Sequence, residues 1–167
     1  AIAVAADQLG FGAIMMTEHH FHSEGLEAST NPLMLLADLA ARTQRIMLAP
    51  LGMVLPGWDP IRAAEDVAIL DQLCKGRLAL GVARGYQPRW SSTLFQSRDV
   101  LPTDSQPGQA EERNQEVFGE ILKIMKLCWT QDTVRYRSEI LGGYSIPSPY
   151  EGIAHWPPRD WTREFGA

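Results

Sequence analysis

Apolar and polar positions along the first ninety residues form blocks of two kinds. Three short apolar runs have the length of buried strands, at residues 11–17, 45–56 and 77–86. Three other stretches carry apolar residues at helical spacing, at residues 1–9, 31–43 and 59–75. The predicted order is therefore helix, strand, helix, strand, helix, strand. Apolar strands that alternate with amphipathic helices predict a parallel sheet covered by helices, which is an α/β fold.

Two of the predicted helices begin with the same local signal. Asn31 precedes Pro32, and Asp59 precedes Pro60. Asn and Asp side chains accept hydrogen bonds from the free N–H groups of a first helical turn, where proline is also well tolerated. Gly10 follows the first helical stretch, and glycine commonly ends a helix. These signals place helix boundaries independently of the apolar pattern.

A less regular stretch follows the third strand. Residues 86–109 are rich in Pro, Ser and Gln and predict a long loop. Loops of this length often cover a binding site, so Trp90 and Phe95 are candidates for contact with a bound substrate. The alternative is that both aromatic residues anchor the loop to the core.

The rest of the chain contains one more strong helical pattern. Residues 110–130 predict an amphipathic helix with acidic residues in its first turn. Residues 133–139 alternate like a strand, and the Gly and Pro residues that follow predict turns. Residues 151–167 show no usable period. We therefore expect a domain over residues 1–150 and a divergent tail over residues 151–167.

Composition and charge narrow the class of protein. A chain of 167 residues with 45% hydrophobic residues can bury one ordinary core. Its 15 basic and 20 acidic residues leave a net charge of -5, which argues against a nucleic-acid partner. Cys74 and Cys128 show no CxxC spacing, as expected for reduced thiols in the cytoplasm. The first residues resemble neither a signal peptide nor a membrane span, so no membrane partner is expected.

Residues that can carry chemistry stand near the end of each apolar strand. These are Glu-His-His at residues 18–20, Leu-Gly at residues 51–52 and Arg-Gly at residues 84–85. Corresponding residues of the three segments, His19, Gly52 and Arg84, lie about 33 residues apart, which is the size of one strand–helix–strand unit. Because the carboxyl ends of parallel strands share one rim of a sheet or barrel, we expect the three segments to converge on one pocket.

The histidines allow more than one interpretation. His19 or His20 can act as a general acid or base, since imidazole titrates near neutral pH. The alternative is that one of the pair points into the wall of the fold and hydrogen-bonds to backbone. His22 adds a third imidazole, yet neither HxxxH nor HExxH occurs, and adjacent strand residues point to opposite faces. We therefore expect no metal site.

Arg84 and the neighbouring glycines suggest a ligand. A guanidinium at the end of a strand suits a phosphate or a carboxylate, and Gly85 allows a ligand to approach the backbone. The alternative for Arg84 is an ion pair with Glu65 or Asp66. Gly52 leaves room for a flat ring to lie against the second strand. The nucleotide-binding motifs GxGxxG and the P-loop are both absent from the sequence.

Four segments taken together, EHHF, NPLMLLADLAART, MVLP and DPIRAAEDVAILDQLCKGRLALGVARGY, resemble the luciferase-like flavin monooxygenases, the family of bacterial luciferase. The resemblance is collinear from residue 1 to about residue 130. It implies a parallel (β/α) barrel of the TIM type, which in this family needs more than about 250 residues. We therefore expect an incomplete barrel, about half of one, in which strands two to four are recognisable. The family's first strand is expected before Ala1 and its later strands after about residue 150.

The same resemblance implies roles for individual residues. His19 matches the catalytic histidine that handles the proton during formation and breakdown of the flavin 4a-hydroperoxide. Leu51–Gly52 falls where the family often has a non-prolyl cis peptide against which the isoalloxazine ring rests. Arg84 matches the arginine that holds the flavin phosphate, and Ala83 lines the ring pocket. Glu18 is also assigned to the cofactor-binding residues.

The implied function is that of a flavin-dependent monooxygenase. Reduced FMN, supplied by a separate flavin reductase, and O2 would oxidise a small organic substrate. Two alternatives remain at this point: a non-catalytic flavin-binding or partner subunit, and a deazaflavin-dependent dehydrogenase. In the family, the helices around residues 31–43 and 59–75 commonly contribute to dimerisation, so a homodimer is expected. The open edges of an incomplete barrel also favour self-association.

Overall fold

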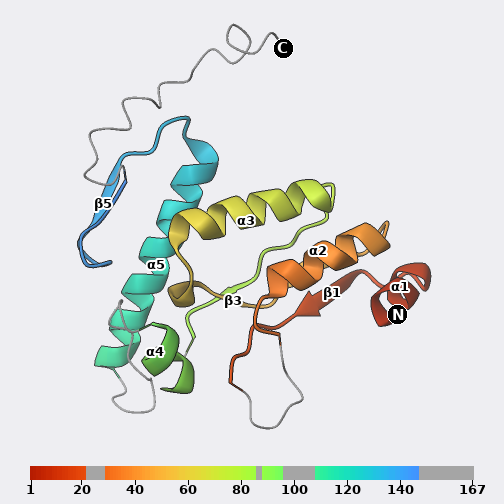
Figure 1. Cartoon of the computed structure of the whole chain (residues 1–167), viewed down its shortest axis with the longest axis horizontal. Helices are drawn as coiled ribbons and strands as arrows, with labels where there is room; N and C mark the ends of the chain where they lie inside the picture. The colour runs from red at the N-terminus through yellow and green to blue at the C-terminus, as the bar shows by residue number, and fades with distance from the viewer. Residues whose placement is uncertain (22–28, 86–87, 96–107, 147–167) are drawn as a thin grey trace, which may run out of the picture.

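The computed structural model describes residues 1–21, 29–85, 88–95 and 108–146 (Figure 1). Helices and strands alternate over the first half of the chain, as the apolar pattern predicted. In chain order the elements are α1 (Ile2–Gln8), β1 (Ala13–Met16), α2 (Pro32–Arg42), β2 (Met47–Pro50), β3 (Met53–Val54), the 3-10 helix η1 (Leu55–Gly57), α3 (Pro60–Leu73), β4 (Val82–Ala83), α4 (Pro88–Leu94), α5 (Gln109–Thr130), β5 (Tyr136–Ser138) and β6 (Tyr144–Ile146).

The three predicted apolar strands lie side by side and run parallel. β1 pairs with β2, with Ala13 opposite Met47. Leu48 forms a parallel bridge to Leu78, and β3 pairs with β4, with Met53 opposite Val82. The second apolar segment therefore lies between the first and the third. The prediction of a parallel α/β arrangement is confirmed.

The strands are shorter and more interrupted than predicted. Residues 45–56 were expected to form one nearly continuous strand, but β2 and β3 are separated at Leu51–Gly52, which is joined by a cis peptide bond. The chain then turns at once into η1. In the third segment the regular strand is confined to β4, although backbone hydrogen bonds from Arg77 to Gly81 already join it to the second segment. An apolar run shows which residues are buried but does not show where the ladder of hydrogen bonds is broken.

The two predicted helix starts are confirmed. The Asn31 side chain accepts a hydrogen bond from the Met34 N–H at 3.1 Å, and α2 begins at Pro32. The Asp59 side chain accepts from the backbone N–H groups of Ile61 and Arg62, each at 3.0 Å. These caps fix where α2 and α3 start and therefore how their apolar faces meet the strands.

The core forms where α2, α3 and α5 pack against the parallel strands (Figure 1). α3 packs against both α2 and α5, and α5 also contacts η1. Fully buried side chains come from the strands and from each of these helices, among them Leu36, Leu48, Met53, Leu70 and Ile121. This packing fixes the positions of the strands whose ends carry the candidate site.

At the amino-terminal side of the sheet, two charged side chains, Asp7 and Arg77, hydrogen-bond to the backbone between α2 and β2. The Asp7 carboxylate accepts 2.7–2.9 Å hydrogen bonds from the backbone N–H groups of Gln44, Arg45 and Ile46. The hydrogen bond from Gln44, helped by those from the next two residues, lowers the pKa of Asp7. The Arg77 guanidinium donates to backbone carbonyls on both sides of the same turn, at Ala40, Thr43 and Ile46, and to the Cys74 carbonyl at the end of α3. Together they fix the turn between α2 and β2.

The predicted loop of residues 86–109 contains a helix where the structure describes it. Residues 88–94 form α4, so the loop prediction is wrong for this part. Trp90 and Phe95 are 3% and 2% exposed, and their burial fixes the segment against the core. The anchoring alternative for the two aromatic residues is therefore confirmed. Most of the remaining loop, His22 and the predicted tail of residues 151–167 lie outside the described residues.

An antiparallel hairpin of β5 and β6 follows α5 and packs on it. The Tyr136 hydroxyl donates to Glu120 on α5 at 2.7 Å, and Lys123 lies 4.7 Å above the Tyr136 ring. The Tyr144 hydroxyl lies 3.1 Å from Asp59, so the hairpin also reaches the start of α3. No helix of the described part of the chain has the length and apolar character needed to cross a membrane.

Candidate functional site

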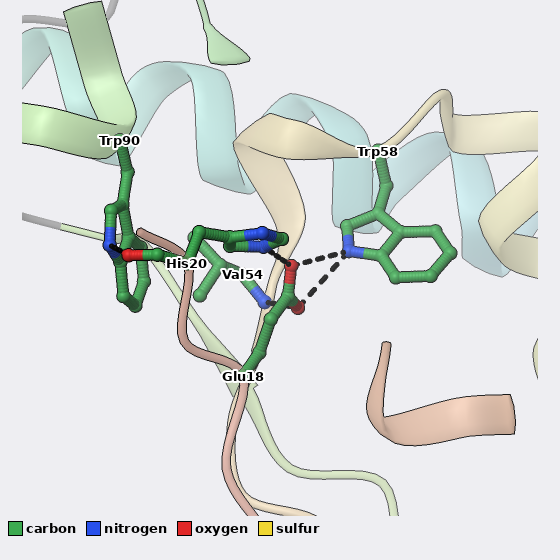
Figure 2. Close-up of polar contacts among 5 residues, drawn as sticks. All are labelled: Glu18, His20, Val54, Trp58 and Trp90. Atoms are coloured by element: carbon green, nitrogen blue, oxygen red, sulfur yellow. Dashed lines mark hydrogen bonds and ion pairs between the residues drawn. The ribbon is translucent and has the colours of Figure 1, made fainter. Parts of the chain in front are cut away.

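The end of β1 is connected to the second strand segment through one buried carboxylate (Figure 2). Glu18 is 4% exposed. Its Oε2 accepts the backbone N–H of Val54 at 2.7 Å, and the Trp58 indole N–H lies 3.1–3.2 Å from both oxygens. Its Oε1 is 3.0 Å from the His20 imidazole. One side chain thus joins the residues after β1 to β3 and to the segment between η1 and α3.

His20 is held from two sides. Because a carboxylate only accepts hydrogen bonds, the proton of the shared bond is on His20 Nε2. On the other side the ring meets Trp90 edge-on at 5.5 Å, and the Trp90 indole donates to the His20 carbonyl at 2.8 Å. His20 is therefore fixed within the fold. This agrees with the alternative interpretation from the sequence, in which one of the two histidines points into the wall of the fold. The side-chain partner of His20 is a carboxylate and not backbone.

His19 has a different environment. Its backbone N–H donates to the Ser29 carbonyl at 2.9 Å, and its partly exposed ring lies 5.5 Å from Trp90 with the two planes tilted by 52°. Trp90 therefore contacts both imidazoles, and it brings α4 against the residues that follow β1. Of the two histidines, His20 is the one that Figure 2 shows hydrogen-bonded to Glu18.

The Leu51–Gly52 peptide bond is cis, which confirms the conformation that the family resemblance implied. The Leu51 N–H donates to the Met16 carbonyl at 2.7 Å, and the Leu51 side chain is exposed. A Cβ atom at Gly52 would lie 3.0 Å from the Val82 carbonyl carbon and 3.1 Å from the Ala83 Cβ. Glycine is therefore needed here for the close approach of β4. The space left by the missing side chain is filled by this strand.

The end of β4 opens into a pocket. This pocket has a volume of about 510 Å³ and is lined by Val82, Ala83, Arg84, Gly85, Glu111, Asn114 and Phe118. One wall comes from the strand end and the other from α5. The pocket combines apolar side chains with the charged pair of Arg84 and Glu111. It adjoins Gly52 through the contact of Gly52 with Ala83.

Arg84 forms an ion pair with a residue that the sequence did not suggest. Its Nη1 lies 2.6 Å from Glu111 Oε1 on α5. Hydrogen bonding to the Arg84 guanidinium lowers the pKa of the Glu111 carboxyl. Glu65 and Asp66, the partners considered from the sequence, instead lie 2.6 and 3.6 Å from Arg62 on the same helix. The expected ion pair is present, but its predicted partners were wrong.

Gly85 has a role beside the pocket. Its φ is +71°, and a Cβ atom there would lie 2.6 Å from Val54 Cγ1 and 3.3 Å from the Phe95 ring. Both the left-handed backbone and the close contacts therefore require glycine. The group that approaches the backbone at this position is the protein's own core. This contact also fixes the direction in which the chain leaves Arg84.

The structure therefore groups the sequence-predicted residues in two neighbouring places. Glu18 and His20 form one network, with His19 beside it on Trp90. Ala83 and Arg84 line the pocket that forms the other place, and Gly52 lies against Ala83. Sequence reasoning missed Trp58 and Glu111, which carry no motif of their own. Among the described residues, no group of three His, Cys, Asp or Glu side chains could hold a metal ion.

Comparisons with known proteins all match one protein family. The family model described as luciferase-like monooxygenase matches residues 1–158. The chain is 31% identical over 131 residues to 3,6-diketocamphane 1,6-monooxygenase of Pseudomonas putida, which covers 78% of this chain and 34% of that protein. It is 38% identical over 101 residues to the alkanal monooxygenase alpha chain of the Kryptophanaron alfredi symbiont, covering 58% of this chain and 28% of that protein.

A solved structure shows the same similarity. The oxygenating constituent of 3,6-diketocamphane monooxygenase from Pseudomonas putida, a type II Baeyer-Villiger monooxygenase in complex with FMN, superposes with a TM-score of 0.72 at 26% identity. The superposition covers 92% of this chain and 39% of that one. The chain thus spans between 28% and 39% of the length of these three relatives.

The Glu18 network predicts a specific loss of stability. Glu18→Gln keeps the shape of the side chain but removes its charge and one of the two oxygens that accept hydrogen bonds from Val54, Trp58 and His20. We expect the free energy of unfolding to fall by about 1–3 kcal/mol. The exposed Glu65→Gln should change it by less than about 0.5 kcal/mol. Urea denaturation of both variants measures the difference, and equal effects would show that the Glu18 contacts contribute nothing specific.

Proposed function

Because the chain belongs to the luciferase-like monooxygenase family, we propose that it forms part of a flavin-dependent monooxygenase. The protein would use reduced FMN and O2 to oxidise a small organic substrate, and a separate flavin reductase would supply the reduced cofactor. Reduced FMN provides the electrons with which O2 is activated. The named relatives act as monooxygenases, and the chain's own residues supply a site that suits such a cofactor.

One observation carries this proposal. Arg84 lines the pocket of about 510 Å³ at the end of β4, and Ala83 in the same pocket lies against Gly52 of the cis Leu51–Gly52 peptide. A guanidinium can bind a phosphate through two parallel hydrogen bonds. Val82, Ala83 and Phe118 add apolar surface to the same pocket. A ligand with a phosphate and a flat apolar ring matches this combination, and FMN has both.

The remaining residues have supporting roles in the proposal. His19 would hold or move a proton at its imidazole, since the imidazole of His20 is already engaged by Glu18. Leu51 and Gly52 would border the flavin ring. Glu18 is buried and both of its oxygens are hydrogen-bonded, so we propose that it acts on the cofactor site by positioning His20 and Val54. This differs from the direct cofactor contact expected from the sequence.

The assembly is part of the same proposal. The three parallel strands with their helices would be strands two to four of a TIM-type barrel. Exposed apolar residues on the outer helices, Met34 and Leu35 on α2 and Ile69 and Leu73 on α3, support a homodimer that buries them. Light scattering at micromolar concentration distinguishes a dimer from a monomer.

Flavin binding tests the proposal directly. In an anaerobic titration followed by flavin fluorescence, we expect micromolar binding of FMN. Arg84→Met should weaken it about tenfold or more, since it removes charged hydrogen bonds to the phosphate. Arg62→Met removes the same charge from an exposed pair outside the pocket and should leave the affinity within about twofold. FMN binding that does not depend on Arg84 contradicts the assignment, and preferential binding of a deazaflavin would favour the dehydrogenase alternative.

His19 is tested by turnover. His19→Ala should slow turnover by on the order of a hundredfold, as expected for loss of a general acid or base, while FMN affinity stays close to that of the wild type. An alkanal and 3,6-diketocamphane are the first substrates to try, because two relatives carry these names. O2 consumption coupled to product formation is the measurement. Unchanged turnover excludes His19 as the proton-transfer group, and FMN binding with no turnover by the wild type favours the non-catalytic alternative.

A further inference from the structure

The ion pair between Arg84 and Glu111 lies inside the pocket that we assign to the cofactor. Arg84 Nη1 and Glu111 Oε1 are 2.6 Å apart, and both residues line the pocket. Their side chains are 41% and 50% exposed, so the pair faces the open space rather than the core. The guanidinium that would receive an anionic ligand therefore already holds an anion from its own chain.

A carboxylate and a phosphate make similar demands on a guanidinium. Both accept its N–H groups, and both neutralise its charge. Because Arg84 lowers the pKa of Glu111, this carboxylate is charged at neutral and mildly acidic pH. A ligand phosphate must either displace Glu111 from Arg84 or lie next to its negative charge. Either arrangement makes Glu111 oppose the binding of an anion.

The pair can open without leaving Glu111 isolated. Gln115 lies one helical turn further along α5, and its Nε2 is already 3.5 Å from Glu111 Oε1. Half-exposed ion pairs are weak, because water competes with both partners. Glu111 can therefore turn from Arg84 toward Gln115 and solvent. α5 does not have to move for this change.

We propose that Glu111 is a specificity-determining residue that competes with the ligand for Arg84 and so selects dianionic phosphate esters over singly charged anions. This inference rests on the proposed function, because it takes the Arg84 pocket as the cofactor site. A carboxylate held on the same chain has a high effective concentration, so a free monoanion gains little by replacing it. A phosphate monoester carries about 1.5 to 2 negative charges at neutral pH and has three strong acceptor oxygens, one more than a carboxylate, so it displaces Glu111.

The variant Glu111→Gln removes the competing charge and keeps the size of the side chain. We expect FMN to bind about three- to fivefold more tightly to this variant, since the competing surface ion pair is lost. Riboflavin, which lacks the phosphate, should bind equally well to variant and wild type. Glu112→Gln is the matched control, because the exposed Glu112 is next to Glu111 in the first turn of α5 and has no described contact with Arg84. It should change FMN affinity by less than about twofold.

Anion titrations examine the same residue without flavin. Inorganic phosphate should shift the Arg84 side-chain N–H signal in NMR spectra of the wild type, and at a lower concentration in Glu111→Gln. Acetate should shift this signal in Glu111→Gln but only weakly in the wild type. The inference is overturned if Glu111→Gln binds FMN or phosphate with unchanged or lower affinity, or if neither chain responds to phosphate.

These outcomes separate the inference from the proposed function. If FMN binds through Arg84 but Glu111→Gln has no effect, the proposed function stands and the role of Glu111 is wrong. If FMN does not bind while phosphate binds more tightly to Glu111→Gln, the competition is supported and the proposed cofactor is wrong. A decrease in affinity would instead show that Glu111 orients Arg84 for the ligand.

Discussion

The buried carboxylate of Glu18 is the interaction on which the candidate site depends. A carboxylate removed from water must be satisfied by hydrogen-bond donors, and here the donors come from different places in the chain: Val54, Trp58 and His20. The residues after β1 therefore cannot shift without breaking contacts to β3 and to the start of α3. Because β3 is paired with β4, the position of Ala83 is linked to that of Glu18 through a short series of contacts.

The two ends of the parallel sheet have different roles. At the amino-terminal side, Asp7 and Arg77 satisfy backbone N–H and carbonyl groups of one turn, and all their described partners belong to the fold itself. At the carboxyl side, Glu18 is satisfied within the fold, whereas Arg84 and Glu111 face a pocket. A rim that is fixed by one buried acid and carries an accessible charged pair suits ligand binding. This rim combines a backbone fixed by Glu18 with two charged side chains, Arg84 and Glu111, that can exchange their hydrogen-bond partners.

Local chemistry explains which parts of the fold were predictable. The Asn31 and Asp59 caps act on the next few residues, so the sequence alone placed the starts of α2 and α3. The apolar runs also predicted three parallel strands in the right order. α4 was missed because its burial depends on Trp90 meeting His19 and His20, a contact between segments about 70 residues apart. Strand lengths were overestimated because apolar character continues through the cis Leu51–Gly52 peptide, where the regular strand is interrupted.

The candidate site was only partly predictable for the same reason. Strand ends that recur every 33 residues or so predicted that the Glu-His-His, Leu-Gly and Arg-Gly segments converge, and the structure places their backbones at one end of the sheet. The cis peptide at Leu51–Gly52 was expected only from the family resemblance. Trp58 and Glu111 were not foreseen, because their partners lie 40 and 27 residues away and neither belongs to a local motif.

The central claim is that three distant strand ends form one cofactor site, and mapping the FMN contacts by NMR tests it most directly. During a titration with oxidised FMN, the backbone amides of His19, Gly52 and Arg84 should shift together with one common dissociation constant. Amides around Gln44 and Lys75, beside the separate pocket at the opposite end of the sheet, should not respond. Shifts confined to one of the three segments, or centred on the opposite end, would contradict the account.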